Sequence, residues 1–313
     1  MDAILNLPPD LPPHDPAPQH PVPARTICEW PAGTFVENVV PLADGSFAVS
    51  VLSEARIDRV LPDGRRVTLA QLARPATGLV LIRGTLFAAV GVPEQTPWSI
   101  WTIDVASGVA SPLFEVTGAV FLNGMAALSA GVLLANESVQ GRVLRLDLRD
   151  RSTTLWLEDE RLLPAPQAPF LPGANGLKLH GGFAWISSNG RALLCRAPIG
   201  EDRAGALEVV AERLRGDDFA FDAQGNVYIA THIGHSLDRL APDGTRVTLA
   251  GADHGLAGST ACAFGITAAD ARALYVTTTG GIIGPIGGVL QPARLVRLAI
   301  GATGAPLVPE ETA

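Results

Sequence analysis

The sequence repeats one pattern six times, and this repetition limits the possible folds more than any other feature of the chain. In each repeat a polar residue precedes a short apolar, β-rich run by about eight to ten positions, and a second strand and a turn follow. The six apolar runs begin at Phe47, Leu86, Val132, Phe183, Val227 and Leu274. Repeats of about 40 to 50 residues are typical of propellers and of arrays of small sheets. We therefore predict an all-β fold, a six-bladed β-propeller around a central channel.

The outer part of each repeat supports this fold. Alternating side chains followed by a tight turn, as at Pro62-Asp63-Gly64, predict a hairpin. Residues 59–70 and 239–250 nearly copy each other, including this turn, which indicates internal duplication. Six units of four strands can close into a ring that leaves no long exposed edge.

The polar residues that precede the apolar runs lie at matching positions in the repeats. They are Glu37, Thr77, Asn123, Asn175, Asp217 and, at a longer offset, Ser259-Thr260. Equivalent positions of a propeller face one channel, so these side chains should converge. Two carboxylates and two amides make an all-oxygen ligand set, which suits one hard divalent cation. The predicted metal ligands are Glu37, Asn123, Asn175 and Asp217. Taken singly, the two Asn-Gly pairs are also common turn signals.

Composition excludes several classes of partner. Only 17% of the residues are charged, the net charge is −8, and Lys178 is the single lysine, so no basic cluster suits nucleic acid or an anionic membrane. Cys28, Cys195 and Cys262 form no C-x-x-C pair, and no secretory signal or 18-residue apolar span is evident. We expect a cytoplasmic protein that acts on a small molecule, as a monomer or weak homodimer.

The chain is expected to form one domain behind a leader. Residues 1–25 are rich in proline and should be extended or disordered. Residues 26–313 should form the single propeller. Two irregular stretches, 160–172 and 280–291, lengthen the fourth and sixth repeats. Long loops of this kind are often lids or binding loops, so both are expected at the rim of the channel.

The order of the motifs resembles the SMP-30/gluconolactonase/LRE family. The similarity covers roughly residues 30 to 300 and rests on motifs at 37–45, 123–126, 175–177, 217–230 and 259–278. The resemblance implies a six-bladed propeller with a divalent metal, usually Ca²⁺ or Zn²⁺, that hydrolyses lactones or, in some relatives, organophosphates. It implies Glu37, Asn175 and Asp217 as metal ligands. By the same resemblance, Asn123 binds metal or substrate.

The expected reaction is hydrolysis of a lactone or a related carboxylic ester. One divalent ion, Ca²⁺ first and Zn²⁺, Mg²⁺ or Mn²⁺ as alternatives, would act as a Lewis acid on the carbonyl oxygen. Asp217 and Asn123 are the catalytic candidates, with Asp217 as general base or nucleophile. Two alternatives stay open: a metal-dependent cyclase, isomerase or lyase, and a propeller that binds a small molecule or protein partner without catalysis.

The expected substrate is less polar than a sugar lactone. Sugar-lactone members of the family often carry an arginine two residues before the Asn123 position, where this chain has Phe121. An aromatic ring removes donors for hydroxyl groups and offers apolar contact instead. Further candidates for substrate contact are Trp185, His232 and Thr260. Core packing is the alternative for Trp185, and a loop hydrogen bond is the alternative to a proton-shuttle role for His232.

Overall fold

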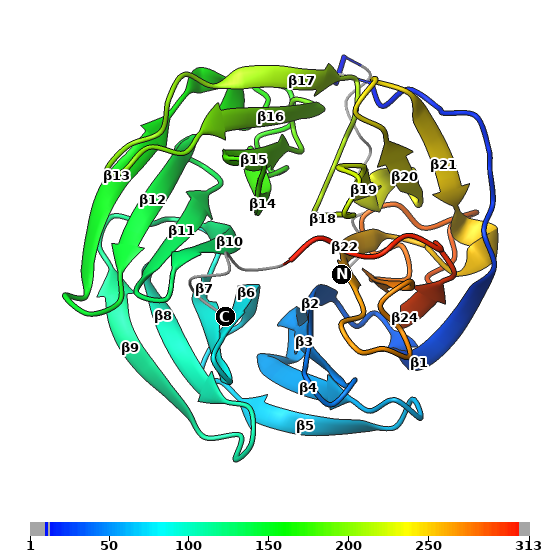
Figure 1. Cartoon of the computed structure of the whole chain (residues 1–313), viewed down its shortest axis with the longest axis horizontal. Coiled ribbons are helices and arrows are strands. Elements are labelled where there is room, and N and C mark those ends of the chain that lie inside the picture. Colours follow the sequence, from blue (N-terminus) through cyan, green and yellow to red (C-terminus); the bar gives the residue numbers. More distant parts are fainter. Residues whose placement is uncertain (1–9, 12, 307–313) are drawn as a thin grey trace.

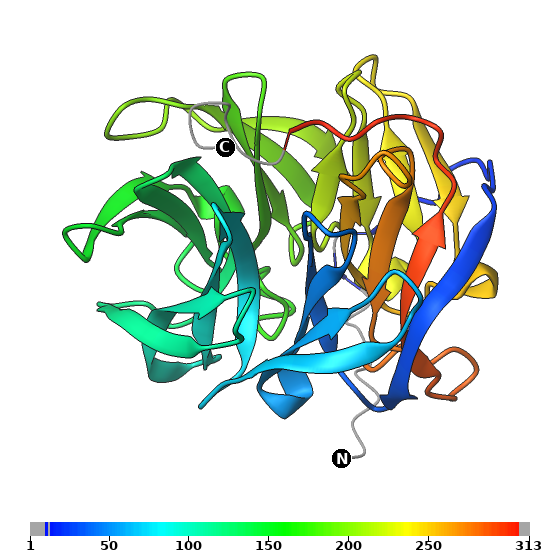
Figure 2. The same cartoon turned by 60° about the horizontal axis from the view of Figure 1, so that its bottom comes forward.

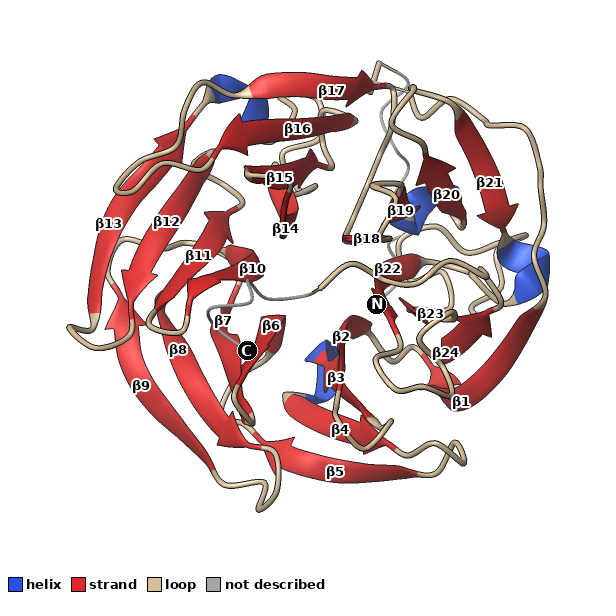
Figure 3. Cartoon of the chain, in the orientation of Figure 1, coloured by secondary structure: helices blue, strands red, loops and turns tan. Residues whose placement is uncertain are grey.

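The computed structural model describes residues 10–11 and 13–306, and its strands form six four-stranded antiparallel sheets around a central axis (Figure 1). Colouring by secondary structure shows strands throughout the ring, with four short 3₁₀ helices between them (Figure 3). The prediction of an all-β, six-bladed propeller is therefore confirmed. No helix in the described part of the chain has the length and apolar character needed to cross a membrane.

The first five blades follow chain order, from the channel outward. Blade 1 contains β2 (Val36–Pro41), β3 (Phe47–Val51), β4 (Arg56–Val60) and β5 (Arg66–Gln71). Blade 2 contains β6 (Ala76–Ile82), β7 (Thr85–Val92), β8 (Gln95–Asp104) and β9 (Ala110–Val116). Blade 3 contains β10 (Leu122–Ser129), β11 (Val132–Glu137), β12 (Arg142–Asp147) and β13 (Ser152–Glu158). Blade 4 contains β14 (Ala174–His180), β15 (Phe183–Ser188), β16 (Leu193–Pro198) and β17 (Glu208–Glu212). Blade 5 contains β18 (Phe219–Phe221), β19 (Val227–Ala230), β20 (Leu237–Leu240) and β21 (Arg246–Ala250).

Blade 6 closes the ring by combining the two ends of the chain. It contains β22 (Ser259–Phe264), β23 (Leu274–Thr278), β24 (Pro292–Leu298) and, outermost, β1 (Ala24–Ala32). β1 pairs antiparallel with β24, so the last blade gains its fourth strand from the start of the chain. This pairing covers an edge that β24 would otherwise expose. The short helices are η1 (Leu52–Glu54), η2 (Glu160–Leu162), η3 (His232–Gly234) and η4 (Ala252–His254).

Apolar side chains fill each interface between neighbouring blades. Between blades 2 and 3, for example, Trp98, Leu122 and Leu133 are fully buried in one cluster. Each such side chain contributes about 1.5–3 kcal/mol by leaving water. Similar clusters occupy the other five interfaces. The inner strands are therefore held on both sides, which fixes the side chains that they present to the channel.

The two nearly identical sequence segments adopt the same turn. Gly64 and Gly244 have φ angles of 85° and 86°, in the left-handed region where glycine carries no penalty. In both turns an aspartate accepts a hydrogen bond from the N–H two residues later, at 3.0 Å in the first and 2.9 Å in the second. The repeat in the sequence is thus a repeat in structure.

Residues 18–22 of the predicted leader are extended along the outside of blade 5. The N–H groups of His20 and Val22 donate to the carbonyls of Thr248 and Leu249 in β21. Nearer the start of the chain, Asp15 pairs with Arg213 at 2.5 Å. In the turned view, the dark-blue ribbon that leads into β1 runs along the outer face of the ring (Figure 2). Residues 1–9 and 12 of the predicted leader lie outside the described residues.

Candidate functional site

Each inner strand carries an irregularity at the position singled out by the repeats. The pairing register skips two residues between Val36 and Val39, and equivalent skips occur in β6, β10, β14 and β22. In blade 5 the skipped pair is Asp217-Asp218, since both bond to Ala230 at 2.8 and 3.0 Å. Two residues opposite one constitute a β-bulge, which re-aims side chains. The skipped pairs begin with Glu37, Thr77, Asn123, Asn175, Asp217 and Thr260.

The close approach of neighbouring inner strands explains why glycine follows asparagine in the two Asn-Gly pairs. A Cβ on Gly124 would lie 2.3 Å from the Asn175 carbonyl oxygen, and one on Gly176 would lie 2.7 Å from the Asp217 carbonyl oxygen. Real Cβ atoms do not approach backbone oxygens so closely, so glycine permits the inner strands to pack side by side. Both pairs lie inside strands, and their alternative interpretation as turns is wrong.

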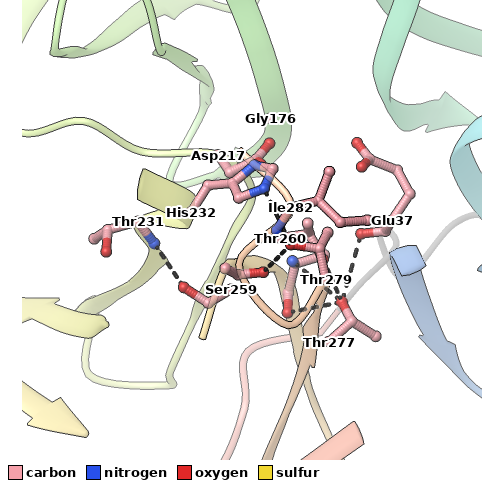
Figure 4. A network of polar contacts seen from close by, with 12 residues as sticks. Glu37, Gly176, Asp217, Thr231, His232, Ser259, Thr260, Thr277, Thr279 and Ile282 are labelled. Carbon is pink, nitrogen blue, oxygen red and sulfur yellow. Dashed lines mark hydrogen bonds and ion pairs between the residues drawn. The ribbon is translucent and has the colours of Figure 1, made fainter. Parts of the chain in front are cut away.

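The structure brings Asp217 and Asn175, two of the predicted ligands, together with His232. Asp217 and His232 are 3% and 4% exposed, and Nδ1 of His232 lies 2.8 Å from Oδ2 of Asp217. The Asn175 side chain also hydrogen-bonds Asp217. The half-buried Glu37 lies near enough for its charge to interact with both Asp217 and His232. Figure 4 shows Glu37, Asp217 and His232 at one edge of a polar network that continues through Thr260 and Thr277.

Burial makes this cluster electrostatically costly without a cation. Burial raises the pKa of Asp217 well above its ordinary value, and the negative charge of Asp218 raises it further. Burial and then the charge of Asp217 likewise raise the pKa of Glu37. Burial lowers the pKa of His232 to about 4, so this imidazole is neutral near pH 7. A divalent cation between the two carboxylates would offset these costs, so the donor set fits such an ion.

The asparagines are necessary parts of this candidate site. Within residues 10–11 and 13–306, no three His, Cys, Asp or Glu side chains are grouped closely enough to hold a metal by themselves. Amide oxygens from Asn175 and Asn123 are therefore needed to complete a ligand set. Both residues are buried at the bulges of neighbouring inner strands.

Four further residues hold the backbone of the bulges, and the polar series predicted from the repeats does not include them. They lie at one register of the second strands, and their side chains contact bulge carbonyl oxygens in the next blade. The pairs are Ser50 with Thr77 at 3.5 Å, Asn136 with Asn175 at 2.8 Å, Ser187 with Asp217 at 2.5 Å and Thr277 with Glu37 at 3.4 Å. The available signal was a polar residue at one repeated position of otherwise apolar strands.

The two threonines of the series make lateral contacts instead of adding acidic or amide ligands. The Thr77 hydroxyl donates to the Leu122 carbonyl at 2.8 Å, and the Thr260 hydroxyl donates to the Val36 carbonyl at 2.9 Å. Each acceptor precedes the bulge residue of the next blade. Thr260, a candidate for substrate contact, therefore ties blade 6 to blade 1.

Asp218 faces a separate partner. Its two carboxylate oxygens lie 2.5 and 2.6 Å from Nζ of Lys178. Lys178 borders a cavity of about 480 Å³ in the channel, whose walls include Met125, Phe221 and residues 303–306. In Figure 1 the red segment that ends at residue 306 runs toward the middle of the ring.

The two predicted aromatic contacts lie in different surroundings. The half-buried Phe121 stacks on Trp98, with ring centroids 5.7 Å apart. Trp185 is 8% exposed, packs against Phe221 and donates from Nε1 to the His180 carbonyl at 3.2 Å. The contacts of Trp185 are thus those of packing between blades 4 and 5, and the structure does not join it to the Asp217 cluster.

The two long loops pack near the start of the inner strands. In the first, Ala165 and Leu171 belong to a small apolar cluster with Leu11 of the leader and Ile233 beside His232. In the second, the Ile282 N–H donates to the Thr279 hydroxyl at 3.3 Å, and Figure 4 shows Ile282 within the network around Glu37 and His232. Both loops therefore enclose the end of the channel that carries the bulges.

The three cysteines are buried free thiols, as expected from their spacing. Burial raises the pKa of Cys195 to about 12. This thiol is therefore protonated and unreactive near neutral pH.

Similar solved structures share the fold of the chain. Regucalcin from Agrobacterium tumefaciens, described as a calcium-binding protein, has a TM-score of 0.72 at 18% identity and covers 93% of this chain and 98% of its own. A luciferin-regenerating enzyme has a TM-score of 0.71 at 14% identity, with 92% and 98% covered. A gluconolactonase from Xanthomonas campestris has a TM-score of 0.67 at 14% identity, with 96% and 98% covered.

These neighbours are the SMP-30/gluconolactonase/LRE propellers that the motifs resemble, so the resemblance is confirmed at the level of the fold. No protein-family model matches the sequence, and no curated protein is significantly similar to it. At such low identity the shared fold does not assign an activity.

Proposed function

We propose that this protein is a divalent-metal-dependent hydrolase of a lactone or related carboxylic ester. The observation that carries the proposal is that half-buried Glu37 and buried Asp217, Asn123 and Asn175 each lie at the bulge of an inner strand. Such a set of oxygen donors is costly to bury. The fold shared with regucalcin and a gluconolactonase supports the same reaction class.

The residues of the site would share two tasks, holding the ion and carrying out the reaction. Glu37, Asn175 and Asp217 would hold the ion, and Asn123 would bind either the ion or the substrate. When bound, the ion supplies Lewis acidity to the substrate carbonyl. The Asn123 amide N–H can donate to the carbonyl oxygen as it gains charge in the tetrahedral intermediate. Asp217 is the candidate to take a proton from the attacking water.

The immediate surroundings favour a substrate with limited polarity. Phe121 lies two residues before Asn123 and presents an aromatic ring rather than a hydrogen-bond donor. Ile282, beside Glu37 and His232 in Figure 4, adds an aliphatic side chain. We infer that an alkyl-substituted lactone or aryl ester fits better than a polyhydroxylated sugar lactone.

Metal analysis combined with a hydrolysis screen tests the proposal. The purified protein should contain or bind one divalent ion per chain, and it should acidify solutions of lactones or aryl esters in a pH-indicator assay that EDTA suppresses. Asp238→Asn is the matched control, because Asp238 is a fully buried carboxylate in β20 that contacts Ser236 and Thr248. This variant should lose stability and keep the metal.

Two outcomes would contradict the proposal. A protein that binds no divalent ion and hydrolyses no substrate at high concentration has neither the site nor the reaction. A protein that binds the ion in the channel without hydrolysis favours a cyclase, isomerase or lyase on the same site.

A further inference from the structure

The channel contains a cavity beyond the bulges, toward the end opposite the candidate metal site. Its volume is about 480 Å³, within the range of about 300–1,000 Å³ that is typical of small-molecule sites. Its walls come from the part of each inner strand that follows the first bulge residue: 38–41, 79–81, 125–127, 178–179, 220–221 and 262–264. In the described part of the chain, none of the four bulge residues of the candidate metal site lines it, and neither do the loops 160–172 and 280–291. The cavity is therefore distinct from the site of the proposed function.

Residues 303–306 form a wall of the cavity at the far end of the channel. The Ala305 N–H donates to the Phe221 carbonyl at 2.9 Å, which fixes this segment to the end of β18. A Cβ on Gly304 would lie 2.5 Å from the Cβ of Phe264, so glycine is needed for the backbone to lie against that side chain. The cavity thus has a built wall where the channel would otherwise open to solvent.

The lining of the cavity is largely apolar. Val80, Met125 and Phe221 contribute side chains to it, and so does Cys262. Burial raises the pKa of the Cys262 thiol, which is therefore uncharged near neutral pH. Apolar cavities take up apolar molecules readily, and a methionine in the wall adapts to their shape. The body of a ligand for this cavity is therefore apolar.

Lys178 and Asn38 bring polar groups to this lining. The Lys178 ammonium has three N–H groups. Two of them suffice for the Asp218 oxygens, at 2.5 and 2.6 Å, which leaves one for another acceptor. Asn38 is 8% exposed, and its backbone N–H donates to the Ser50 hydroxyl at 2.9 Å. Among the described residues, its side-chain amide has no hydrogen-bond partner.

The backbone at Asn38 does not require an amide side chain. Asn38 is the second residue of its bulge, and the same position is glycine in the next three blades, at Gly78, Gly124 and Gly176. A buried amide without a partner is costly, and buried polar groups in native proteins are nearly always hydrogen-bonded. A ligand in the cavity would supply the missing partner.

We propose that this cavity is a second small-molecule site, which takes a neutral, largely apolar ligand with one carbonyl or hydroxyl oxygen. The oxygen would accept a hydrogen bond from the Asn38 amide, with the remaining N–H of Lys178 as a further donor. The ligand is neutral because the Lys178–Asp218 pair carries no net charge, so a buried ionic group would lack a counter-charge. This site needs no divalent ion, and the inference goes beyond the proposed function.

Fluorescence titration with N-phenyl-1-naphthylamine, an uncharged probe that brightens in apolar surroundings, tests the proposal on the full chain in EDTA. Three displacing ligands of similar size are compared near pH 7: butyrophenone, butylbenzene and 4-phenylbutyrate. We expect one probe molecule per chain and about 5-fold tighter binding of butyrophenone than of butylbenzene, as for one added hydrogen bond. The ionised 4-phenylbutyrate should bind at least about 10-fold more weakly than butyrophenone.

Two matched variants locate the ligand. Asn38→Leu should bind butyrophenone and butylbenzene equally, because the donor for the carbonyl is lost. It should unfold at a temperature no lower than wild type, because the amide that it removes has no protein partner. Asn123→Leu, the same change at a bulge residue outside the cavity, should keep the preference for butyrophenone. Thermal unfolding checks that both variants fold.

Several results would overturn the inference. They are the absence of probe binding in wild type, equal affinities for butyrophenone and 4-phenylbutyrate, and a preference for butyrophenone that persists in Asn38→Leu or disappears in Asn123→Leu. A chain shortened to end at residue 306 covers a further alternative. If its affinity for the probe is 10-fold higher than that of the full chain, the chain's own end competes for the cavity and the inference is wrong. Because EDTA keeps divalent ions away, none of these results decides the proposed function, which the metal and hydrolysis assays test separately.

Discussion

Glu37 and Thr260 occupy the same bulge in neighbouring blades, but the structure uses them in different ways. Glu37 keeps a free carboxylate whose pKa is raised by burial and by Asp217. Thr260 directs its hydroxyl sideways to the carbonyl of Val36, the residue before Glu37. One backbone feature thus carries the proposed ion ligands in four blades and a tie between blades in two. The difference teaches that the identity of the bulge residue, rather than the blade geometry, decides where an ion can bind.

The largest effect is expected when a ligand position loses its charge. Asp217→Asn should lower divalent-ion affinity and hydrolysis by roughly 100-fold or more, because a direct ligand is lost and not only a residue that orients one. The same change also removes a buried charge that needs the ion, so the metal-free variant should unfold at a temperature no lower than metal-free wild type. Calorimetric titration and thermal unfolding measure both quantities. Unchanged ion affinity would remove Asp217 from the ligand set.

A smaller effect is expected at the residue that holds the Asp217 backbone. Ser187 contacts the Asp217 carbonyl at 2.5 Å and accepts from the Gly176 N–H at 2.8 Å. Ser187→Ala should weaken ion binding by about 10-fold, as expected for a residue that orients a ligand. Ser99→Ala, in β8 of blade 2 where the hydroxyl contacts Val90 and Trp101, is the control and should leave ion binding unchanged. Equal effects of the two changes would contradict a local role for Ser187.

The threonine positions should affect stability without affecting the ion. Thr260→Val keeps the volume but leaves the buried Val36 carbonyl without this donor, which should cost about 1–2 kcal/mol of unfolding free energy. Thr77→Val should behave similarly, since its hydroxyl donates to the Leu122 carbonyl. Denaturant unfolding measures the loss. A large fall in ion affinity in either variant would contradict the proposal that the bulge threonines join neighbouring blades and do not bind the ion.

The smallest effect concerns substrate choice. Phe121→Arg introduces donors for hydroxyl groups beside Asn123, so the ratio of kcat/KM for a sugar lactone to that for an alkyl lactone should rise a few-fold. Because Phe121 stacks on Trp98, the variant should also lose some stability. Phe121→Leu is the control, since it removes the ring without adding donors. If the ratio of the two kcat/KM values is the same in Phe121→Arg and Phe121→Leu, Phe121 does not select the substrate.

The fold was predictable because the sequence repeats its pattern of strands and turns six times. Apolar runs at a regular period specify the second strand of each blade, and the turn at Asp63 recurs at Asp243. The alignment of the polar residues across the repeats was also predictable. Every inner strand has its bulge at the same place, so the spacing from the polar residue to the following apolar run is similar from blade to blade. Glu37 and Asp217 could therefore be paired from positions alone, although they are far apart in the chain.

Other parts of the site depend on contacts that no repeat encodes. The approach of His232 to Asp217 requires the conformation of one loop, with a positive φ at the histidine itself. The interior position of Trp185 depends on the packing of Phe221 from the next blade. Thr260 resembles a ligand position in the sequence, and only the neighbouring strand shows that its hydroxyl is engaged.

The central claim is that the bulge residues of four blades bind one divalent ion. Calorimetric titration of the metal-free protein with Zn²⁺ and Ca²⁺, repeated for Glu37→Gln, Asp217→Asn and Thr260→Val, tests it most directly. The account predicts one ion per chain in wild type and Thr260→Val, and strongly weakened binding in the two carboxylate variants. Absence of binding in wild type, or equal binding in wild type and Asp217→Asn, would contradict it.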